Sequence, residues 1–431
     1  MAEKIGLSEA IAMAVGGMVG GGIFAVSGVV AVEAGPSAWL AFIASGLIAA
    51  SAGYSFVRLN DLLSEPGSPI TMIEAFTGRT DLAGMMRWTF VIGYIGTMGL
   101  YAYAFGSYFV ALFGINTVTG LSAQPLISAI VVLVFVGINA TGAHASGRTE
   151  DALVGLKVLI LLLFCFGGIY YEFTHGELQS GLASLGTGPL IAAALSFVAF
   201  EGWELLLFDQ ESIRDPRQTV SKAVFVSIAG VTVLYVLVAI VTTSLVSATV
   251  IQANSETALA IAAAPFLGQL GFSLISIAAL FSTASALNAT LFSTSRLMNQ
   301  LATEQLLPRR LESHGGDPVR ELVILGVLTA SLATLGSLNA ISSFASLAFI
   351  VIFGLVSALA YRKHSDAATS TVVPIVGTGG AIATVLALVW YLAVIEPGTF
   401  VVVVFLTVLV ILMELFYFER IPIEEEIESL A

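Results

Sequence analysis

Long apolar stretches restrict the fold of this chain more than any other feature of its sequence. Of its 431 residues, 57% are apolar and 10% are charged, whereas a soluble protein carries about 25% charged residues. A helix needs about 20 apolar residues to cross the hydrocarbon core of a membrane. The stretches predict an all-α integral membrane protein with twelve spans, near residues 9–32, 37–58, 86–113, 125–141, 152–171, 188–208, 219–247, 265–296, 320–336, 340–361, 372–394 and 398–418.

The basic residues predict the orientation of these spans. Positive residues gather in the loops on the cytoplasmic side of a membrane protein. The loops near residues 33, 114–124, 172–187, 248–264, 337–339 and 395–397 contain no Lys or Arg. Both termini are therefore predicted to be cytoplasmic in a multi-pass protein of the cell membrane. Fifteen of the 16 basic residues lie on the other side: Lys4, Arg58, Arg79, Arg87, Arg148, Arg214, Arg217, Lys222, Arg296, Arg309, Arg310, Arg320, Arg362, Lys363 and Arg420.

The first span carries five glycines within seven residues: Gly16, Gly17, Gly20, Gly21 and Gly22. Each glycine costs a helix about 1 kcal/mol relative to alanine, so this stretch is predicted to unwind. Unwound backbone would turn its N–H groups toward a ligand, and the dipole of the following half-helix would favour a carboxylate there. The alternative is close helix packing through Gly16 and Gly20. Three consecutive glycines favour the broken helix.

The sixth span contains two carboxylates beside a glycine, at Glu201, Gly202 and Glu204. Carboxylates within a membrane usually face a cavity or the interior of a helix bundle. The alternative is that the span ends early and Glu204 borders the cytoplasm. However, residues 205–208 continue the apolar run. Breaks in the first and sixth spans are typical of an inverted-repeat transporter with its site at the midplane.

Four blocks of sequence resemble the amino acid–polyamine–organocation superfamily of transporters. Residues 16–24 resemble its G-x-M-[IV]-G-x-G-I-F signature, and residues 197–223 resemble its F-x-A-[FY]-x-G-[FW]-E block, except that Val220 replaces an expected proline. Residues 258–288 are similar to the proton-coupled ApcT-type amino acid transporters. Residues 296–308 resemble the loop after the eighth span. The final two spans match only in hydrophobicity.

This resemblance implies a LeuT-like fold in a single domain. Two inverted five-helix repeats would cover about residues 9–171 and 188–361, with discontinuous first and sixth helices. Two peripheral helices (372–418) and an acidic cytoplasmic tail (419–431) would follow. The implied function is secondary active transport of broad or neutral amino acids. The N–H groups of Gly21 and Gly22, beside Gly20, would hold the substrate carboxylate, and the carbonyls of Met18, Val198 and Glu201 would hold its ammonium.

Lys157 is the one basic residue that lies away from the predicted cytoplasmic side of the spans. It aligns with the lysine that replaces a coupling sodium ion in ApcT-like transporters. The implied neighbours are the carbonyls of Gly16 and Val19 and the hydroxyls of Ser282 and Ser285, so Lys157 is predicted to couple transport to protons. The alternative is that its four methylenes carry the amine toward the membrane surface. Glu204 is predicted to help proton movement or to stabilise the break.

Several other functions stay open or are disfavoured. Glu201 could attract a cationic amino acid or polyamine, and an exchanger of the same fold is not distinguished from a symporter. Lys157 argues against sodium coupling because an ammonium and a sodium ion cannot share one site. Repeated pore helices or rings of charge, expected of a channel, are not found, and neither is an enzyme motif. The single cysteine Cys165 lies in an apolar run, so neither a disulfide nor a cysteine metal site is expected. We also expect no other metal, no cofactor and no nucleic acid. The predicted partners are the substrate, the proton and the lipid bilayer; partner proteins are not indicated.

Overall fold

The computed structural model describes residues 4–63, 67–141, 147–176, 181–182, 186–208, 210–303, 319–365 and 370–418. The predicted tail at 419–431 and residues 304–308 of the predicted block at 296–308 lie outside these residues. All twelve predicted segments contain helix. Eleven correspond to α1 (Leu7–Ala34), α2 (Ala38–Leu62), α4 (Thr80–Phe113), α5 (Ala123–Ala140), α6 (Gly147–His175), α9 (Pro216–Leu245), α11 (Ala258–Thr303), α12 (Val319–Leu335), α13 (Leu338–Arg362), α14 (Val372–Val394) and α15 (Pro397–Phe418).

The sixth predicted segment is divided into α7 (Gly188–Ser196), the 3₁₀ turn η3 (Phe197–Phe200) and α8 (Leu205–Phe208). Within the described residues, eight stretches are long and apolar enough to cross a membrane, and one of them, Leu7–Leu62, contains both α1 and α2. Two shorter apolar stretches are Gly188–Phe200 and Pro397–Val408. The protein is thus a helical membrane protein, and the number of twelve crossings stays a prediction.

Short elements that the apolar pattern did not predict connect these helices. They are η1 (Gly35–Ser37), α3 (Pro69–Thr77), η4 (Gln210–Ser212), α10 (Ala248–Ala253), η5 (Ser255–Thr257), and a hairpin of β1 (Thr117–Val118) and β2 (Leu121–Ser122). In α3, the side chain of Ser68 accepts a hydrogen bond from the Thr71 N–H at 3.2 Å, and Pro69 occupies the first turn. Such local capping needs no long apolar run. The apolar pattern therefore does not predict these short elements.

The long helix α11 bends near its start. Gly268 leaves the helical conformation with φ 59° and ψ −150°, and Pro265 lies three residues earlier. Proline removes a backbone donor from a helix, and glycine adopts positive φ without a steric penalty. These two residues therefore separate a short first part of α11 from the part that continues to Thr303.

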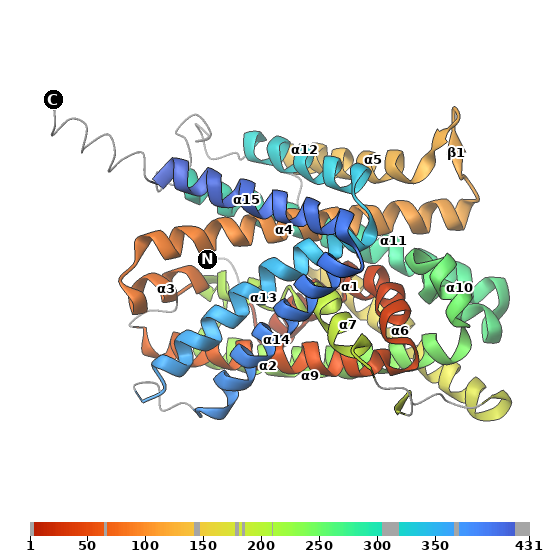
Figure 1. Cartoon of the computed structure of the whole chain (residues 1–431), viewed down its shortest axis with the longest axis horizontal. Helices are drawn as coiled ribbons and strands as arrows, with labels where there is room; N and C mark the ends of the chain where they lie inside the picture. Colours follow the sequence, from red (N-terminus) through yellow and green to blue (C-terminus); the bar gives the residue numbers. More distant parts are fainter. Residues whose placement is uncertain are drawn as a thin grey trace.

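The first helix lies at the centre of the helical bundle. It contacts α4, α6, α7, α9 and α11, and its residues from Met18 to Ala31 are all buried. In Figure 1, α5 and α12 lie side by side along one flank, while α2 and α9 lie along the opposite flank. The helix α14 packs against α13 and α2. This arrangement surrounds α1 with spans from both halves of the sequence.

The N-terminal segment is joined to the chain just after α8. The Ile5 N–H donates to the Ser212 carbonyl at 2.9 Å, and the Arg214 N–H donates to the Ile5 carbonyl at 2.9 Å. Ile5 and Ile213 thereby form a short parallel β-bridge. The start of α1 and the far end of the sixth segment are therefore connected by backbone hydrogen bonds.

Candidate functional site

The first helix is continuous, so the predicted break at its glycines is wrong for this structure. The α-helix runs from Leu7 to Ala34 without interruption, and the N–H groups of Gly20, Gly21 and Gly22 lie inside it. In a water-free interior an unsatisfied backbone group costs several kcal/mol. A glycine in a helix costs only about 1 kcal/mol. The hydrogen bonds of the helix therefore outweigh the weak helix propensity of its glycines.

The glycines of α1 instead permit close packing, which was the alternative interpretation. A Cβ atom built on Gly17 would lie 2.8 Å from the Cα of Gly202, and one on Gly22 would lie 2.6 Å from the Cα of Ala199. Real Cβ atoms do not approach other atoms this closely. The neighbours of Gly16, Gly20 and Gly21 are Val154 of α6, Ala286 of α11 and Tyr101 of α4. The five glycines thus allow several neighbouring elements to pack closely against different sides of α1.

The sixth segment is interrupted where the sequence predicts it. After η3, Glu201 is extended with φ −76° and ψ 150°, and Gly202 has φ 119°. Side chains other than glycine rarely adopt that conformation. A Cβ on Gly202 would also lie 2.6 Å from the carbonyl carbon of Gly17. The break therefore needs glycine at this position for two reasons, backbone conformation and contact with α1.

Hydroxyl groups from two other spans satisfy the backbone groups that this break leaves open. Ser45 of α2 donates to the Ala193 carbonyl at 2.8 Å. Ser342 and Ser346 of α13 both donate to the Leu195 carbonyl, at 2.7 and 3.0 Å. The Val198 N–H donates in turn to the Ser346 hydroxyl at 3.0 Å. Because the end of a helix leaves carbonyls and N–H groups without partners, these serines make the interruption stable at depth.

Side chains from three other helices also donate to carbonyls in the glycine-rich part of α1. Lys157 Nζ of α6 donates to the Gly16 carbonyl at 3.0 Å. The Tyr235 hydroxyl of α9 lies 2.6 Å from the Met18 carbonyl and 3.0 Å from the Ala199 carbonyl. The Ser282 hydroxyl of α11 donates to the Val19 carbonyl at 2.6 Å. The carbonyls of Gly16, Met18 and Val19 therefore accept hydrogen bonds from outside the helix.

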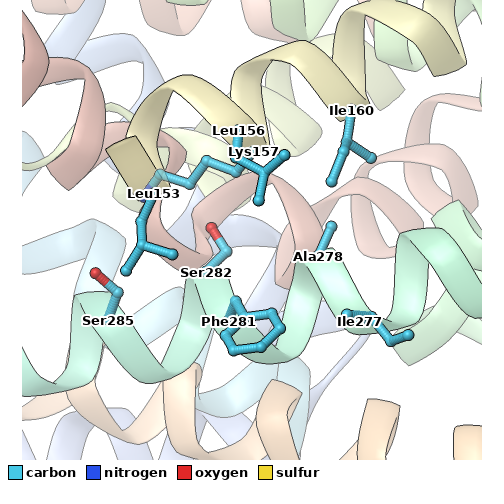
Figure 2. Close-up of a pocket in the computed structure, with 9 residues that line it drawn as sticks. All are labelled: Leu153, Leu156, Lys157, Ile160, Ile277, Ala278, Phe281, Ser282 and Ser285. Carbon is cyan, nitrogen blue, oxygen red and sulfur yellow. The ribbon is translucent and has the colours of Figure 1, made fainter. Parts of the chain in front are cut away.

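Lys157 lies in a pocket between α6 and α11, which Figure 2 shows in close-up. Its side chain is 5% exposed, and the ammonium faces α1 rather than the membrane surface, contrary to the alternative in which the amine reaches that surface. The pocket has a volume of about 80 Å³. Its lining comprises Leu153, Leu156, Lys157 and Ile160 of α6, and Ile277, Ala278, Phe281, Ser282 and Ser285 of α11.

The two carboxyl groups of the sixth segment are buried but differ in their partners. Glu204 is fully buried, so the interpretation that it borders the cytoplasm is wrong. Its carboxylate accepts from the Gly202 N–H at 2.8 Å and from the Tyr94 hydroxyl at 3.4 Å. Glu201 is 2% exposed, and its Oε2 atom has no hydrogen-bond partner in the described part of the chain. Within the described residues, the Oε2 atom of Glu201 is therefore a buried carboxyl oxygen without a donor.

The structure brings together residues that the sequence analysis did not select. Tyr235 contacts both α1 and η3, although it was unremarkable within an apolar run. Ser342 and Ser346 support the break from α13. Signals existed for both: Tyr235 carries a hydroxyl in the middle of α9, and Ser342, Ser343 and Ser346 are clustered near the start of α13. Neither signal indicates which backbone atoms the side chain would meet.

Comparisons with known proteins show the family of the chain. The sequence profile of the amino acid permease family matches residues 5–416. Protein MJ0609 of Methanocaldococcus jannaschii is 34% identical over 352 residues, which cover 81% of this chain and 80% of that protein. The inner membrane transport protein YbaT of Escherichia coli is 30% identical over 390 residues, which cover 87% of each chain.

A solved structure shares the fold. The crystal structure of a manganese transporter from Eremococcus coleocola superposes with a TM-score of 0.62 and 15% sequence identity, covering 95% of each chain. At this identity the likeness concerns the fold alone, which is that of LeuT-like transporters. The profile match spans most of the chain, and YbaT is named as a transport protein, whereas MJ0609 is uncharacterized. The chain is therefore a member of the amino acid permease family within the amino acid–polyamine–organocation superfamily.

Proposed function

We propose that this protein carries amino acids across the cell membrane by alternating access and that proton movement drives the transport. The observation that carries the proposal is the contact of Gly17 with Gly202, which sets the glycine-rich part of α1 against the break in the sixth segment. Two further relatives support the substrate class. They are the serine/threonine exchanger SteT and the branched-chain amino acid permease BcaP, both of Bacillus subtilis.

The substrate would bind between the break and α1. Its ammonium would meet the carbonyls of Met18, Val198 and Glu201, and its carboxylate would meet the N–H groups of Gly21 and Gly22, near Gly20. This step requires α1 to unwind locally in another state of the transport cycle. The side chains that donate to the carbonyls of Gly16, Met18 and Val19 support that change, because they keep these carbonyls bonded when bonds within the helix open. The Tyr235 hydroxyl would leave the Met18 carbonyl as the substrate ammonium arrives.

Lys157 would couple this change to the proton. Its ammonium joins α6 to α1 through the Gly16 carbonyl at 3.0 Å, while Ser282 joins α11 to α1 through Val19. A buried ammonium is costly unless an acceptor faces it. Loss of the proton would remove the attraction to Gly16 and free α6 to separate from α1. Ser285 lines the same pocket and would accept from the ammonium when it turns away from α1.

The carboxyl groups have separate roles in the proposal. Glu204 stabilises the break through the Gly202 N–H and offers a second position for a proton. Glu201 lies at the proposed substrate position, with Thr97 and Glu204 as neighbours. Its unpartnered oxygen favours a second candidate, transport of cationic amino acids or polyamines. A Glu201→Gln variant decides between them: if Glu201 selects cations, arginine loses its ability to compete with alanine and leucine, and otherwise competition is unchanged.

The proposed architecture has two inverted halves. Repeat 1 would run over about residues 9–171 and repeat 2 over about residues 188–361, so that α1 and the broken segment are their first spans. The peripheral helices α14 and α15 would follow, with both termini in the cytoplasm. The even number of predicted spans and the loops without Lys or Arg on one side support this topology.

The test is uptake into proteoliposomes by a panel of amino acids, with and without an inward proton gradient. We expect the gradient to raise the accumulation of at least one amino acid at least tenfold. Lys157→Ala should abolish that increase while ligand binding stays measurable by thermal shift. Lys222→Ala, which removes an exposed lysine of α9, is the matched control and should behave as wild type.

Full acid-stimulated uptake by Lys157→Ala would contradict proton coupling through this residue. Exchange is separated from net uptake by loading the vesicles with substrate. If uptake needs internal substrate and ignores the gradient, the protein is an exchanger rather than a symporter. If neither condition produces uptake of any amino acid, the proposed substrate class is wrong.

A further inference from the structure

The pocket beside Lys157 opens toward the outside of the helical bundle. Three of its lining residues are large, apolar and exposed: Leu156 at 51%, Ile277 at 41% and Phe281 at 60%. Leu156 lies on α6, and the other two lie on α11. Figure 2 shows the two helices facing each other across the pocket, with the methylene stem of Lys157 between them. The pocket is therefore a groove with an apolar rim and Lys157 at its inner side.

A membrane around these two helices would place lipid hydrocarbon at this rim. Both α6 and α11 contain stretches that are long and apolar enough to cross a membrane. The candidate span of α6 begins at Ala152, and a helix rises 1.5 Å per residue, so the groove between Leu153 and Ile160 reaches from about 2 to about 12 Å into the membrane. Half of the hydrocarbon core is about 15 Å thick. The groove thus lies within one leaflet, at the depth of its acyl chains.

The chemistry of the lining excludes most other occupants. Six of its nine residues are apolar, and the ammonium of Lys157 and the hydroxyl of Ser282 are directed to carbonyls of α1. Apolar cavities do not hold water well, because each water molecule needs two to four polar partners. A lining of this kind therefore suits a segment of hydrocarbon chain better than water.

We propose that an acyl chain of a membrane lipid occupies the groove between α6 and α11 as a specific ligand. Its methylenes would fill the space between Leu156 and Phe281 and contact the stem of Lys157. The chain would exclude water from the lipid side of Lys157 and maintain the spacing of the two helices that hold it. The site depends on the membrane setting of the chain and is independent of which solute is transported.

The experiment uses the whole protein in proteoliposomes with a phospholipid that carries a diazirine in the middle of one acyl chain. After irradiation, adducts are mapped by mass spectrometry of peptides. The chain offers matched controls outside the groove: Leu159 on α6 is 52% exposed and Leu274 on α11 is 43% exposed. We expect at least threefold more label on Leu156 than on Leu159, and on Ile277 than on Leu274. This excess should saturate as the fraction of labelled lipid increases.

A groove-filling variant provides the second arm. Ala278→Leu enlarges a buried lining residue and should reduce the label on Leu156 and Ile277 to the level of Leu159 and Leu274. Val226→Leu enlarges an exposed residue of α9 and should leave the pattern unchanged. Equal labelling of the matched pairs in the wild type, or an excess that never saturates, overturns the proposal even if Ala278→Leu does not fold. No transport is needed for the readout, so the proposed function is tested separately.

Discussion

The first helix and the sixth segment both contain glycine and both have backbone in contact with neighbouring elements, but only the sixth segment is broken. Helix α1 has five glycines between residues 16 and 22 and remains continuous. The sixth segment is interrupted around the single glycine Gly202. Glycine content therefore does not decide where a membrane helix breaks. The difference lies in what surrounds each backbone.

At the break, other spans supply partners for the open groups. Serine hydroxyls from α2 and α13 bond to Ala193, Leu195 and Val198. In α1, side-chain donors reach the carbonyls of residues 16, 18 and 19, whereas the helix itself holds the N–H groups of Gly20 to Gly22. A break at depth is stable only when both donors and acceptors are satisfied. By this criterion the carbonyls of α1 already have outside donors for an unwound state, whereas the N–H groups of Gly20 to Gly22 are bonded within the helix.

Gly202→Ala should cause the largest loss of stability among the variants that test this comparison. The substitution places a side chain at φ 119° and a Cβ against Gly17. We expect a loss of stability of about 2–6 kcal/mol, from backbone strain of about 1–3 kcal/mol and overpacking of about 1–3 kcal/mol. Thermal unfolding in detergent measures it. The matched control is Gly230→Ala in α9, where a Cβ meets nothing within 4 Å; a similar loss in both variants would disprove the special role of Gly202.

Ser346→Ala should have an intermediate effect. It removes a donor to the Leu195 carbonyl and the acceptor of the Val198 N–H, and a buried unsatisfied group costs about 1–3 kcal/mol. Ser342 still serves Leu195, which limits the loss. The control is Ser357→Ala on the same helix, since the Ser357 hydroxyl donates to the Phe353 carbonyl one turn earlier in that helix. We expect lower thermal stability and slower uptake for Ser346→Ala alone, and equal behaviour of both variants would show that the serines do not maintain the break.

Tyr235→Phe should have the smallest effect on stability and a more specific effect on binding. A single neutral hydrogen bond contributes about 0.5–1.5 kcal/mol, and Tyr108→Phe removes a comparable bond to the Phe24 carbonyl of α1. Only Tyr235 also contacts η3, at Ala199. We therefore expect similar stability losses but a changed substrate affinity for Tyr235→Phe alone. Isothermal titration compares the two, and unchanged affinity in both variants would remove Tyr235 from the proposed ammonium position.

Much of the fold could be predicted because it depends on local properties. The twelve helical segments follow from runs of apolar residues, whose length must match the membrane. The interruption at residues 197–204 follows from Glu201, Gly202 and Glu204, which a continuous apolar helix would not contain. The contact between Lys157 and Gly16 was expected from the resemblance to ApcT-like transporters, and the structure places that hydrogen bond at 3.0 Å.

The tertiary structure decided the conformation of the glycine string and the partners of the break. Ser346 is 148 residues from Val198, and Tyr235 is 217 residues from Met18. No local pattern links residues so distant in sequence. The sequence shows how much helix stability the glycines cost. Whether the helix breaks depends on hydrogen-bond partners that are brought close only when distant spans pack together. The sequence by itself therefore determined the spans and the site of interruption, while packing determined that α1 stays helical and which side chains hold it.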